Sequence, residues 1–218
     1  MPAWVHAVER AYVAAAVHVR APDAHLGNAS SPDAANAHVP SSNQVAAGPA
    51  AANTRAHALA AAGAIASHYL AVGTPRSFGI LIDDASQVEA AALSLAAHRA
   101  WFTPRDIRCA SAGDGAGADA LAAATGGRVA SLAEALACDI ANVYGASIAI
   151  TPGSLRRGTH VNALHADRID PELAQLATVV REAGLPALAA GLVDGRQLDE
   201  LTIFAVDGAP IALAALVG

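Results

Sequence analysis

Short β-type runs alternate with helical stretches between residues 77 and 164, and this alternation constrains the fold more than any other feature of the sequence. The expected strands are 77–82, 106–110, 128–130, 140–144 and 159–164, and the expected helices between them are 86–98, 118–124 and 132–137. A helix between two strands returns the chain to the same end of the sheet, so consecutive strands run parallel. The pattern therefore predicts an α/β fold, a parallel sheet with helices on both faces.

The segments on either side of this region are less regular. Residues 4–17 have the apolar spacing of an amphipathic helix, and a stretch rich in Pro, Asn and Ser follows up to residue 49. A long alanine-rich helix is then expected from a cap at Asn53 and Thr54 to Ala71. After residue 164 we expect a helix over 171–183, extended segments at 187–193 and 202–206, and a final short helix over 210–216.

The chain contains no lysine, because all 13 of its basic residues are arginine. This absence excludes chemistry that needs a lysine amine, which includes Schiff bases, pyridoxal phosphate anchoring and the Walker A phosphate contact. The length of 218 residues suits one domain or two small ones, and about 60 residues are alanine.

The charge pattern and the ends of the chain limit its partners and its location. The net charge is −6 and the arginines are spread singly, so we expect no nucleic acid partner. No strongly apolar run approaches the roughly 20 residues that span a bilayer, so we expect no membrane insertion. The first residues lack the pattern of a signal peptide, and Cys109 and Cys138 have no CxxC spacing. These features predict a cytoplasmic protein with reduced thiols.

Several motifs, read in order, resemble one known family. They are SHYLA (67–71) before FGILI (78–82), CDI (138–140), LRRGTHVNA (155–163) and GRQLDELTIF (195–204). Over most of residues 54–213 the chain resembles the ornithine cyclodeaminase and μ-crystallin family, and GTHVNA is the most specific motif. The resemblance implies an NAD(P)-binding Rossmann domain at 73–193, and a second domain, from 1–72 and 194–218, that dimerises and binds substrate. Family members use the cofactor to oxidise or reduce small amino or imino acids.

In that family the first strand leads into a glycine-rich GxGxQ turn, because the pyrophosphate must approach backbone N–H groups at a helix N-terminus. Here the turn is IDDASQ (82–87), in which side chains replace the glycines, and two of these side chains are the carboxylates of Asp83 and Asp84. In a partly buried cleft with an effective dielectric constant of about 20, a carboxylate repels a like charge at ~4 Å by about 4 kcal/mol. The sequence therefore predicts that ordinary dinucleotide binding is lost.

A second glycine-rich turn, GDGAGA, contains Gly113, Gly115 and Gly117 and matches G-x-G-x-x-A. Its functional interpretation is a displaced NAD or NADP loop, and its structural interpretation is a strand-to-helix turn. The structural interpretation is favoured, since no acid ends a strand about 20 residues further on. The end of the preceding strand, CASA (109–112), also offers a ribose neither an acid nor an arginine.

The resemblance also implies a lysine, an arginine and an aspartate on the substrate side. The lysine is absent, and Ala58 aligns with the arginine, with Arg55 one helical turn away. Asp167 keeps the spacing of the aspartate after GTHVNA, but His165 replaces the glycine two residues before it.

The carboxylates allow another interpretation. Asp83 and Asp84, at the carboxyl end of the first strand, are candidates for an acid and a base, together with His165 and Asp167. The structural interpretation is that one of the two adjacent aspartates caps the next helix while the other is solvated. The nine histidines lack the spacing of metal ligands, so no metal site is expected.

The favoured hypothesis is a catalytically degenerate relative of the family that uses no cofactor. It would be a homodimer that serves as a scaffold or binds a protein partner or a small molecule. One alternative is a divergent NAD(P)-dependent oxidoreductase that uses the turn from Gly113 to Gly117. Another is a cofactor-free lyase, hydrolase or cyclase built on Asp83, Asp84, His165 and Asp167.

Overall fold

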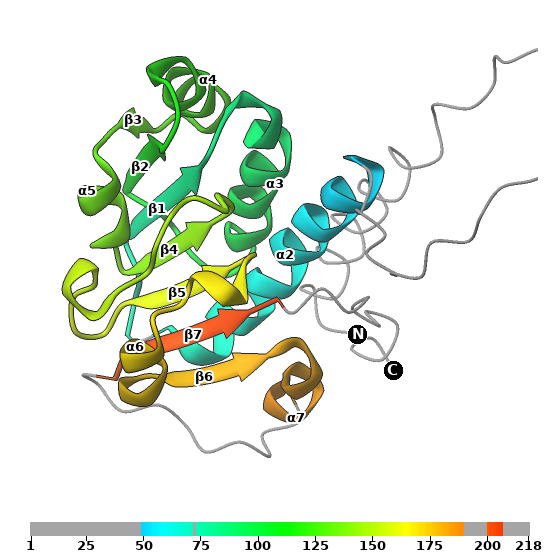
Figure 1. Cartoon of the computed structure of the whole chain (residues 1–218), viewed down its shortest axis with the longest axis vertical. Coiled ribbons are helices and arrows are strands. Elements are labelled where there is room, and N and C mark those ends of the chain that lie inside the picture. The colour runs from blue at the N-terminus through cyan, green and yellow to red at the C-terminus, as the bar shows by residue number, and fades with distance from the viewer. Residues whose placement is uncertain (1–48, 72, 190–199, 207–218) are drawn as a thin grey trace, which may run out of the picture.

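The computed structural model describes residues 49–71, 73–189 and 200–206, which form a parallel sheet with helices on both faces (Figure 1). The strands are β1 (Ser77–Ile82), β2 (Asp106–Ser111), β3 (Arg128–Val129), β4 (Ile140–Val143), β5 (His160–Ala163), β6 (Thr178–Arg181) and β7 (Thr202–Ala205). The α/β fold and the strands expected between residues 77 and 164 are therefore confirmed. The helices expected at 4–17 and 210–216 lie outside the described residues.

The order of the strands identifies where a ligand would bind. Within the described residues the sheet has seven strands in the order β3-β2-β1-β4-β5-β7-β6, and every neighbouring pair is parallel. The first five strands have the 3-2-1-4-5 order of a Rossmann-like sheet. The direction of strand progression reverses between β1 and β4, and we call the carboxyl ends of these two strands the switch point. Open α/β sheets bind ligands at such a point.

The helices cover both faces of the sheet. They are α2 (Pro49–Leu70), α3 (Val88–His98), α4 (Gly115–Thr125) and α7 (Leu185–Ala189) on one face, and α5 (Leu132–Leu136) and α6 (Pro171–Leu176) on the other. Helix α2 begins before the cap that we expected at Asn53. In Figure 1, α2 and α3 lie together against one side of the sheet, while α5 lies across it from them.

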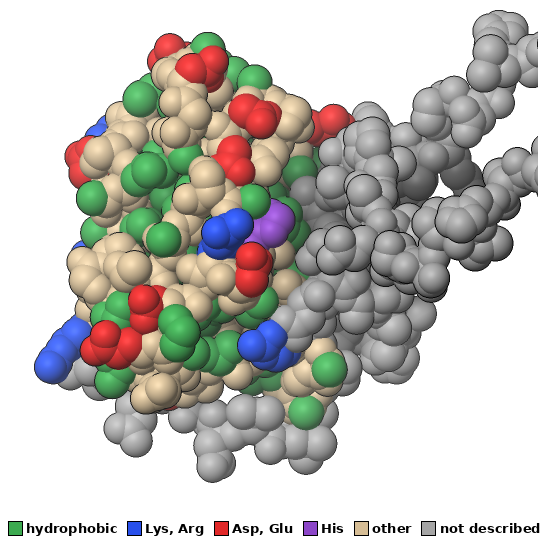
Figure 2. Space-filling view, in the orientation of Figure 1, with side chains coloured by type: hydrophobic (Ala, Val, Ile, Leu, Met, Phe, Trp, Pro, Cys, Tyr) green, Lys and Arg blue, Asp and Glu red, His purple; other side chains and the backbone are tan. Residues whose placement is uncertain are grey.

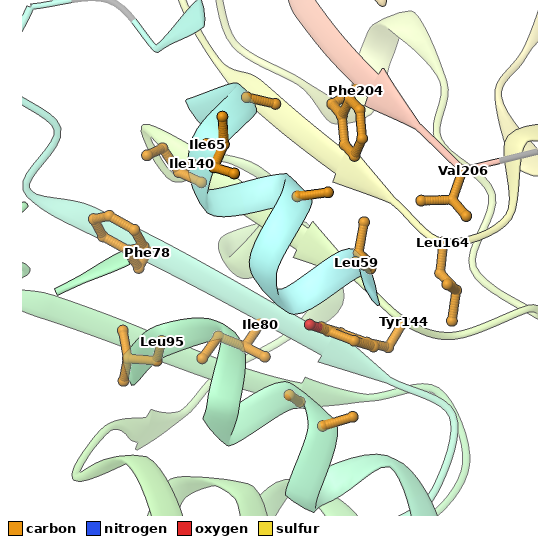
Figure 3. Packing of buried hydrophobic residues seen from close by; sticks show 14 of the residues in the cluster. Leu59, Ile65, Phe78, Ile80, Leu95, Ile140, Tyr144, Leu164, Phe204 and Val206 are labelled. Atoms are coloured by element: carbon orange, nitrogen blue, oxygen red, sulfur yellow. The ribbon is translucent and has the colours of Figure 1, made fainter. Parts of the chain in front are cut away.

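The main hydrophobic core lies between the sheet and helices α2 and α3 (Figure 3). Phe78, Ile80 and Ile82 of β1 belong to this core. Leu81 points to the opposite face of the sheet and belongs to the core there. A strand that is buried on both faces is apolar almost throughout, which explains the sequence SFGILI.

Two expected elements are wrong. The helix expected over 171–183 ends at Leu176, because Thr178–Arg181 form the edge strand β6, which pairs with β7. Three consecutive β-branched residues, Thr178 to Val180, favour a strand, and the pairing with β7 stabilises it. The extended segment expected at 187–193 is also wrong where it is described, since Leu185–Ala189 are helical.

Two elements of the expected second domain, α2 and β7, belong to these packed layers. Helix α2 packs on the sheet through residues that include Leu59 and Ile65, and β7 lies between β5 and β6. Most residues of the small dimerisation domain, at 1–48 and 207–218, lie outside the described residues, so this division stays a prediction. No helix in the described ranges combines the length and the apolar character that a bilayer span requires.

Candidate functional site

The side chain of Asp83 bridges the carboxyl ends of β1 and β4. Its carboxylate accepts hydrogen bonds from the backbone N–H groups of Ala146 (2.7 Å) and Ser147 (3.2 Å), in the loop after β4. The Ser147 hydroxyl donates a third hydrogen bond to the same carboxylate. Asp83 is therefore not the solvated residue of the structural interpretation. A negative group supplied by the chain itself lies at the point where this fold places a ligand.

Two glycines and a glutamine bring the surrounding loops together. A Cβ at Gly145 would lie 2.5 Å from the Asp83 carboxylate, and one at Gly113 would lie 2.6 Å from the Asp83 carbonyl oxygen. Side chains at either position would push the loops apart. Gln87 accepts a hydrogen bond from the Asp83 N–H (2.7 Å) and donates one to the Tyr144 carbonyl (3.2 Å). Sequence reasoning did not single out Gln87, although its place in the GxGxQ-type turn was a signal for it.

Asp84 caps η1 (Ala85–Gln87), the single turn that leads into α3. The hydroxyl and the backbone N–H of Ser86 donate hydrogen bonds to the Asp84 carboxylate, and both lower the pKa of this carboxyl. In a dinucleotide-binding fold, the N–H groups at this helix start face the pyrophosphate. Here one of them is already bonded to a carboxylate, as the capping interpretation of the two aspartates expects.

The turn that contains Gly113, Gly115 and Gly117 packs against the loop after β1. The Gly113 N–H donates a hydrogen bond to the Asp83 carbonyl oxygen (3.0 Å). Helix α4 begins at Gly115, and Asp114 caps it by accepting a hydrogen bond from the Gly117 N–H (3.1 Å). These contacts are those of a strand-to-helix turn.

His165 and Asp167 lie beyond the end of β5, and β4 separates them from Asp83. His165 is half-buried at the start of η3 (Ala166–Arg168), and Asp167 is exposed, with its carboxylate 3.5 Å from the Arg168 Nε. Neighbouring strands are about 4.8 Å apart, which puts the ends of β1 and β5 about 10 Å apart. The candidate residues therefore share one edge of the sheet but follow two different strands.

Acidic side chains gather at the carboxyl edge of the sheet. The residues that follow β1, β2 and β5 there include Asp83, Asp84, Asp114 and Asp167, of which Asp167 is paired with Arg168. At the amino edge, arginines that precede β1, β2 and β5 lie among the carboxylates of Asp106 and Asp139. Figure 2 shows isolated charges and no broad basic area on the face in view. The edge that would receive a dinucleotide is thus acidic, which disfavours an anion there.

Asp139 of the CDI motif joins the amino ends of β1 and β4. Its carboxylate accepts hydrogen bonds from the N–H groups of Arg76 (2.8 Å) and Ser77 (2.8 Å), from the Ser77 hydroxyl (2.9 Å), and from the Arg156 guanidinium. Burial alone would raise the pKa of the Asp139 carboxyl, but these hydrogen bonds outweigh it and the pKa is lowered. Asp139 therefore has a structural role, because it connects β1 and β4 at the amino edge of the sheet, opposite the switch point.

His160 and Asn162 of GTHVNA belong to a buried polar network. The Asn162 amide donates hydrogen bonds to the Ser67 hydroxyl (2.9 Å) and to Asn142 Oδ1 (2.9 Å). The His160 ring contacts Asn162 Oδ1 (3.1 Å) and the Thr202 hydroxyl (2.8 Å). Residues two apart in a strand share a face, which is why both motif side chains lie on the α2 side. The GTHVNA motif therefore connects β5 to α2 through hydrogen bonds of its side chains.

His98 of α3 completes this network, and sequence reasoning did not single it out. Its Nδ1 must donate to the Ser94 carbonyl oxygen (2.7 Å), which only accepts, so its Nε2 accepts from the Ser67 hydroxyl (3.0 Å). Complete burial lowers the pKa of His98 to about 4, although the Ser94 carbonyl opposes this effect. His98 is therefore neutral at pH 7, and its position on the apolar face of α3 was the only signal for it.

The two cysteines are poorly placed to act as nucleophiles in this fold. Cys109 and Cys138 are free and buried, and burial raises the pKa of both thiols, that of Cys138 to about 11. In the part of the chain that is described, no three His, Cys, Asp or Glu side chains lie close enough together to hold a metal ion.

No protein-family model and no curated protein matches the sequence. Solved structures do match the fold. An archaeal alanine dehydrogenase dimer with bound NAD has a TM-score of 0.58 at 21% identity over 75% of this chain. The Δ1-pyrroline-2-carboxylate reductase of Thermococcus litoralis, in complex with NADH and L-proline, has a TM-score of 0.57 at 19% identity over 74% of it. A probable ornithine cyclodeaminase from Bordetella pertussis Tohama I has a TM-score of 0.55 at 18% identity over 78% of it.

These likenesses establish the fold that the sequence resemblance implied. The described sheet and helices are arranged as in ornithine cyclodeaminase, alanine dehydrogenase and pyrroline-carboxylate reductase structures. The chain spans 63%, 64% and 66% of the three solved chains, which is less than two thirds of their length.

Proposed function

We propose that this chain is a catalytically degenerate protein of the ornithine cyclodeaminase-like fold, without NAD-dependent chemistry. It would act as a homodimeric scaffold, or bind a protein partner or a small molecule. The observation that supports this proposal best is the position of Asp83. Its carboxylate bridges the switch point and is held there by two backbone N–H groups and one hydroxyl.

The residues at the switch point do not fit a dinucleotide. A pyrophosphate at the start of α3 would lie beside the Asp84 carboxylate and would have to displace it from the Ser86 N–H. Repulsion between unit charges about 4 Å apart costs about 1 kcal/mol in water and about 4 kcal/mol in a partly buried cleft. Since about 1.4 kcal/mol is a tenfold loss of affinity, Asp83 and Asp84 together weaken binding by at least about tenfold.

The absence of lysine supports the same proposal on the substrate side. The resemblance implies a lysine near the reacting centre, and every basic residue of this chain is arginine. Arginine does not give up its proton near neutral pH, so it cannot replace a lysine in proton transfer.

A divergent NAD(P)-dependent oxidoreductase is the second candidate. One observation favours it, since two of the solved structures with this fold contain NAD or NADH. Such an enzyme would have to place the cofactor at the turn from Gly113 to Gly117, whose N–H groups already bond to Asp83 and Asp114. We therefore keep it as the alternative.

A fluorescence titration with NADH and NADPH separates the two candidates. We expect no saturable binding by the wild type into the millimolar range, and measurable binding by the double variant Asp83→Gly/Asp84→Gly. Asp119→Asn, which removes an exposed charge from α4, is the matched control and should stay without binding. Micromolar binding by the wild type would refute the degenerate assignment. Sedimentation velocity tests the homodimer, and a monomer at every concentration would contradict it.

A further inference from the structure

Two buried polar atoms, one on β4 and one on the residue that follows it, lack a hydrogen-bond partner in the described structure. They are the Asn142 amide nitrogen and the Tyr144 hydroxyl, in side chains that are 1% and 0% exposed. Leaving either group unpaired destabilises the folded chain, and native structures contain few such atoms. Two of them only two residues apart therefore need an explanation.

The two atoms lie on the same face of the sheet and near the same side chain. Residues 142 and 144 are two apart in the chain, and strand geometry points both toward α2 and α3. The Ser94 hydroxyl donates a hydrogen bond to the Asn142 amide oxygen (3.4 Å). It is also near enough to the Tyr144 hydroxyl to oppose, by hydrogen bonding, the rise in the Tyr144 pKa that burial causes. In Figure 3 the Tyr144 ring lies between α2 and α3, with its oxygen inside the core.

Rotating the amides does not remove the unpaired atom. The Asn142 oxygen accepts from the Asn162 amide nitrogen, and the Asn162 oxygen faces His160. Reversing both amides exchanges nitrogen for oxygen at each position, and an unpaired amide oxygen of Asn142 then takes the place of the unpaired nitrogen.

From this geometry we propose a binding site for one internal water molecule between Asn142, Tyr144 and Ser94. The water accepts hydrogen bonds from the Asn142 amide and the Tyr144 hydroxyl, and it donates one to the Ser94 oxygen. Internal waters typically make about three such bonds to buried polar groups that have no other partner. This water belongs to the network that joins α2 and α3 to the sheet, and the inference does not depend on the proposed function.

Tyr144→Phe tests the site, because it removes one hydroxyl and keeps the ring. Oxygen-17 magnetic relaxation dispersion counts internal waters that exchange slowly with bulk solvent. We expect the variant to lose one such water per molecule, whereas Tyr69→Phe, at a half-buried tyrosine of α2, keeps the wild-type number. An unchanged count in Tyr144→Phe would overturn the proposal.

The stability of the same variant gives a second readout, because removing the hydroxyl has different effects when it is bonded to water and when it is unpaired. If water satisfies the Tyr144 hydroxyl, its removal lowers the folding equilibrium constant by about fivefold, as the loss of an ordinary hydrogen bond does. If the hydroxyl is unpaired, its removal leaves that constant unchanged or raises it. Urea unfolding of Tyr144→Phe at neutral pH distinguishes these outcomes, and an unchanged or more stable variant would also overturn the proposal.

Discussion

Acidification should reveal the cost of keeping His98 neutral inside the core. Burial lowers the pKa of His98 from 6.5 to about 4 in the folded chain. Between these two values the unfolded chain takes up a proton at this position and the folded chain does not. The free energy of unfolding therefore decreases as the pH falls through this window, and the loss is complete below the folded pKa.

The size of the effect follows from the two pKa values. One pKa unit corresponds to about 1.36 kcal/mol. At about pH 5, roughly one and a half pH units below the unfolded pKa, protonation of the unfolded state lowers the free energy of unfolding by about 2 kcal/mol. Below about pH 4 this decrease reaches about 3 kcal/mol. Typical domains are stable by about 5–15 kcal/mol, so this loss is readily measured.

Urea unfolding of wild type and His98→Gln at about pH 7.5, 6 and 5 isolates this contribution. The variant should be less stable at about pH 7.5, because the hydrogen bonds of His98 with Ser67 and Ser94 are disrupted. The stability gap should narrow by about 2 kcal/mol at about pH 5, since glutamine does not titrate. His68→Gln, at an exposed histidine of α2, is the control: it retains His98, so its difference in stability from wild type should change little with pH. A gap between wild type and His98→Gln that is constant over this range would refute the reasoning.

Three further perturbations test the packing around the sheet. Gly79→Ala should abolish stable folding, because a Cβ there would lie 1.9 Å from the Ala135 carbonyl oxygen; loss of the cooperative thermal transition checks this. Ser131→Ala should cost about 1 kcal/mol in urea unfolding through loss of the capping box of α5, and an unchanged midpoint would contradict that role. Cys109 and Cys138 should react with a thiol reagent at about pH 8 only after unfolding, since burial raises the pKa of both thiols; fast labelling of the folded protein would show otherwise.

The central part of the fold could be predicted from the sequence because local signals agree with the packing there. β1 is a continuous apolar run that is buried on both faces, and both the turn η1 that follows it and helix α4 that follows β2 begin with an aspartate cap. The region of β6 could not be predicted in this way. Its residues follow a short helix without a break signal, and only the pairing of Thr178–Arg181 with β7, far along the chain, makes them a strand.

The residues of the candidate site could be predicted from the sequence, but their hydrogen-bond partners could not. Sequence reasoning found that the turn lacks its glycines and carries two carboxylates, Asp83 and Asp84, and the structure agrees with a capping role for Asp84. The partners of Asp83 could not be read from the sequence, because Ala146 and Ser147 lie more than 60 positions away in a loop without a motif. Asp83 bonds to them only because β1 and β4 are neighbours in the sheet.

A crystal structure of the wild-type protein grown with a saturating concentration of NADH tests the central claim most directly. We predict that the Asp83 carboxylate is bonded to the Ala146 and Ser147 N–H groups, and that Asp84 caps η1, the turn that leads into α3, with no dinucleotide at the switch point. A pyrophosphate seated at the Ser86 N–H, with Asp83 turned away from the loop after β4, would contradict the account.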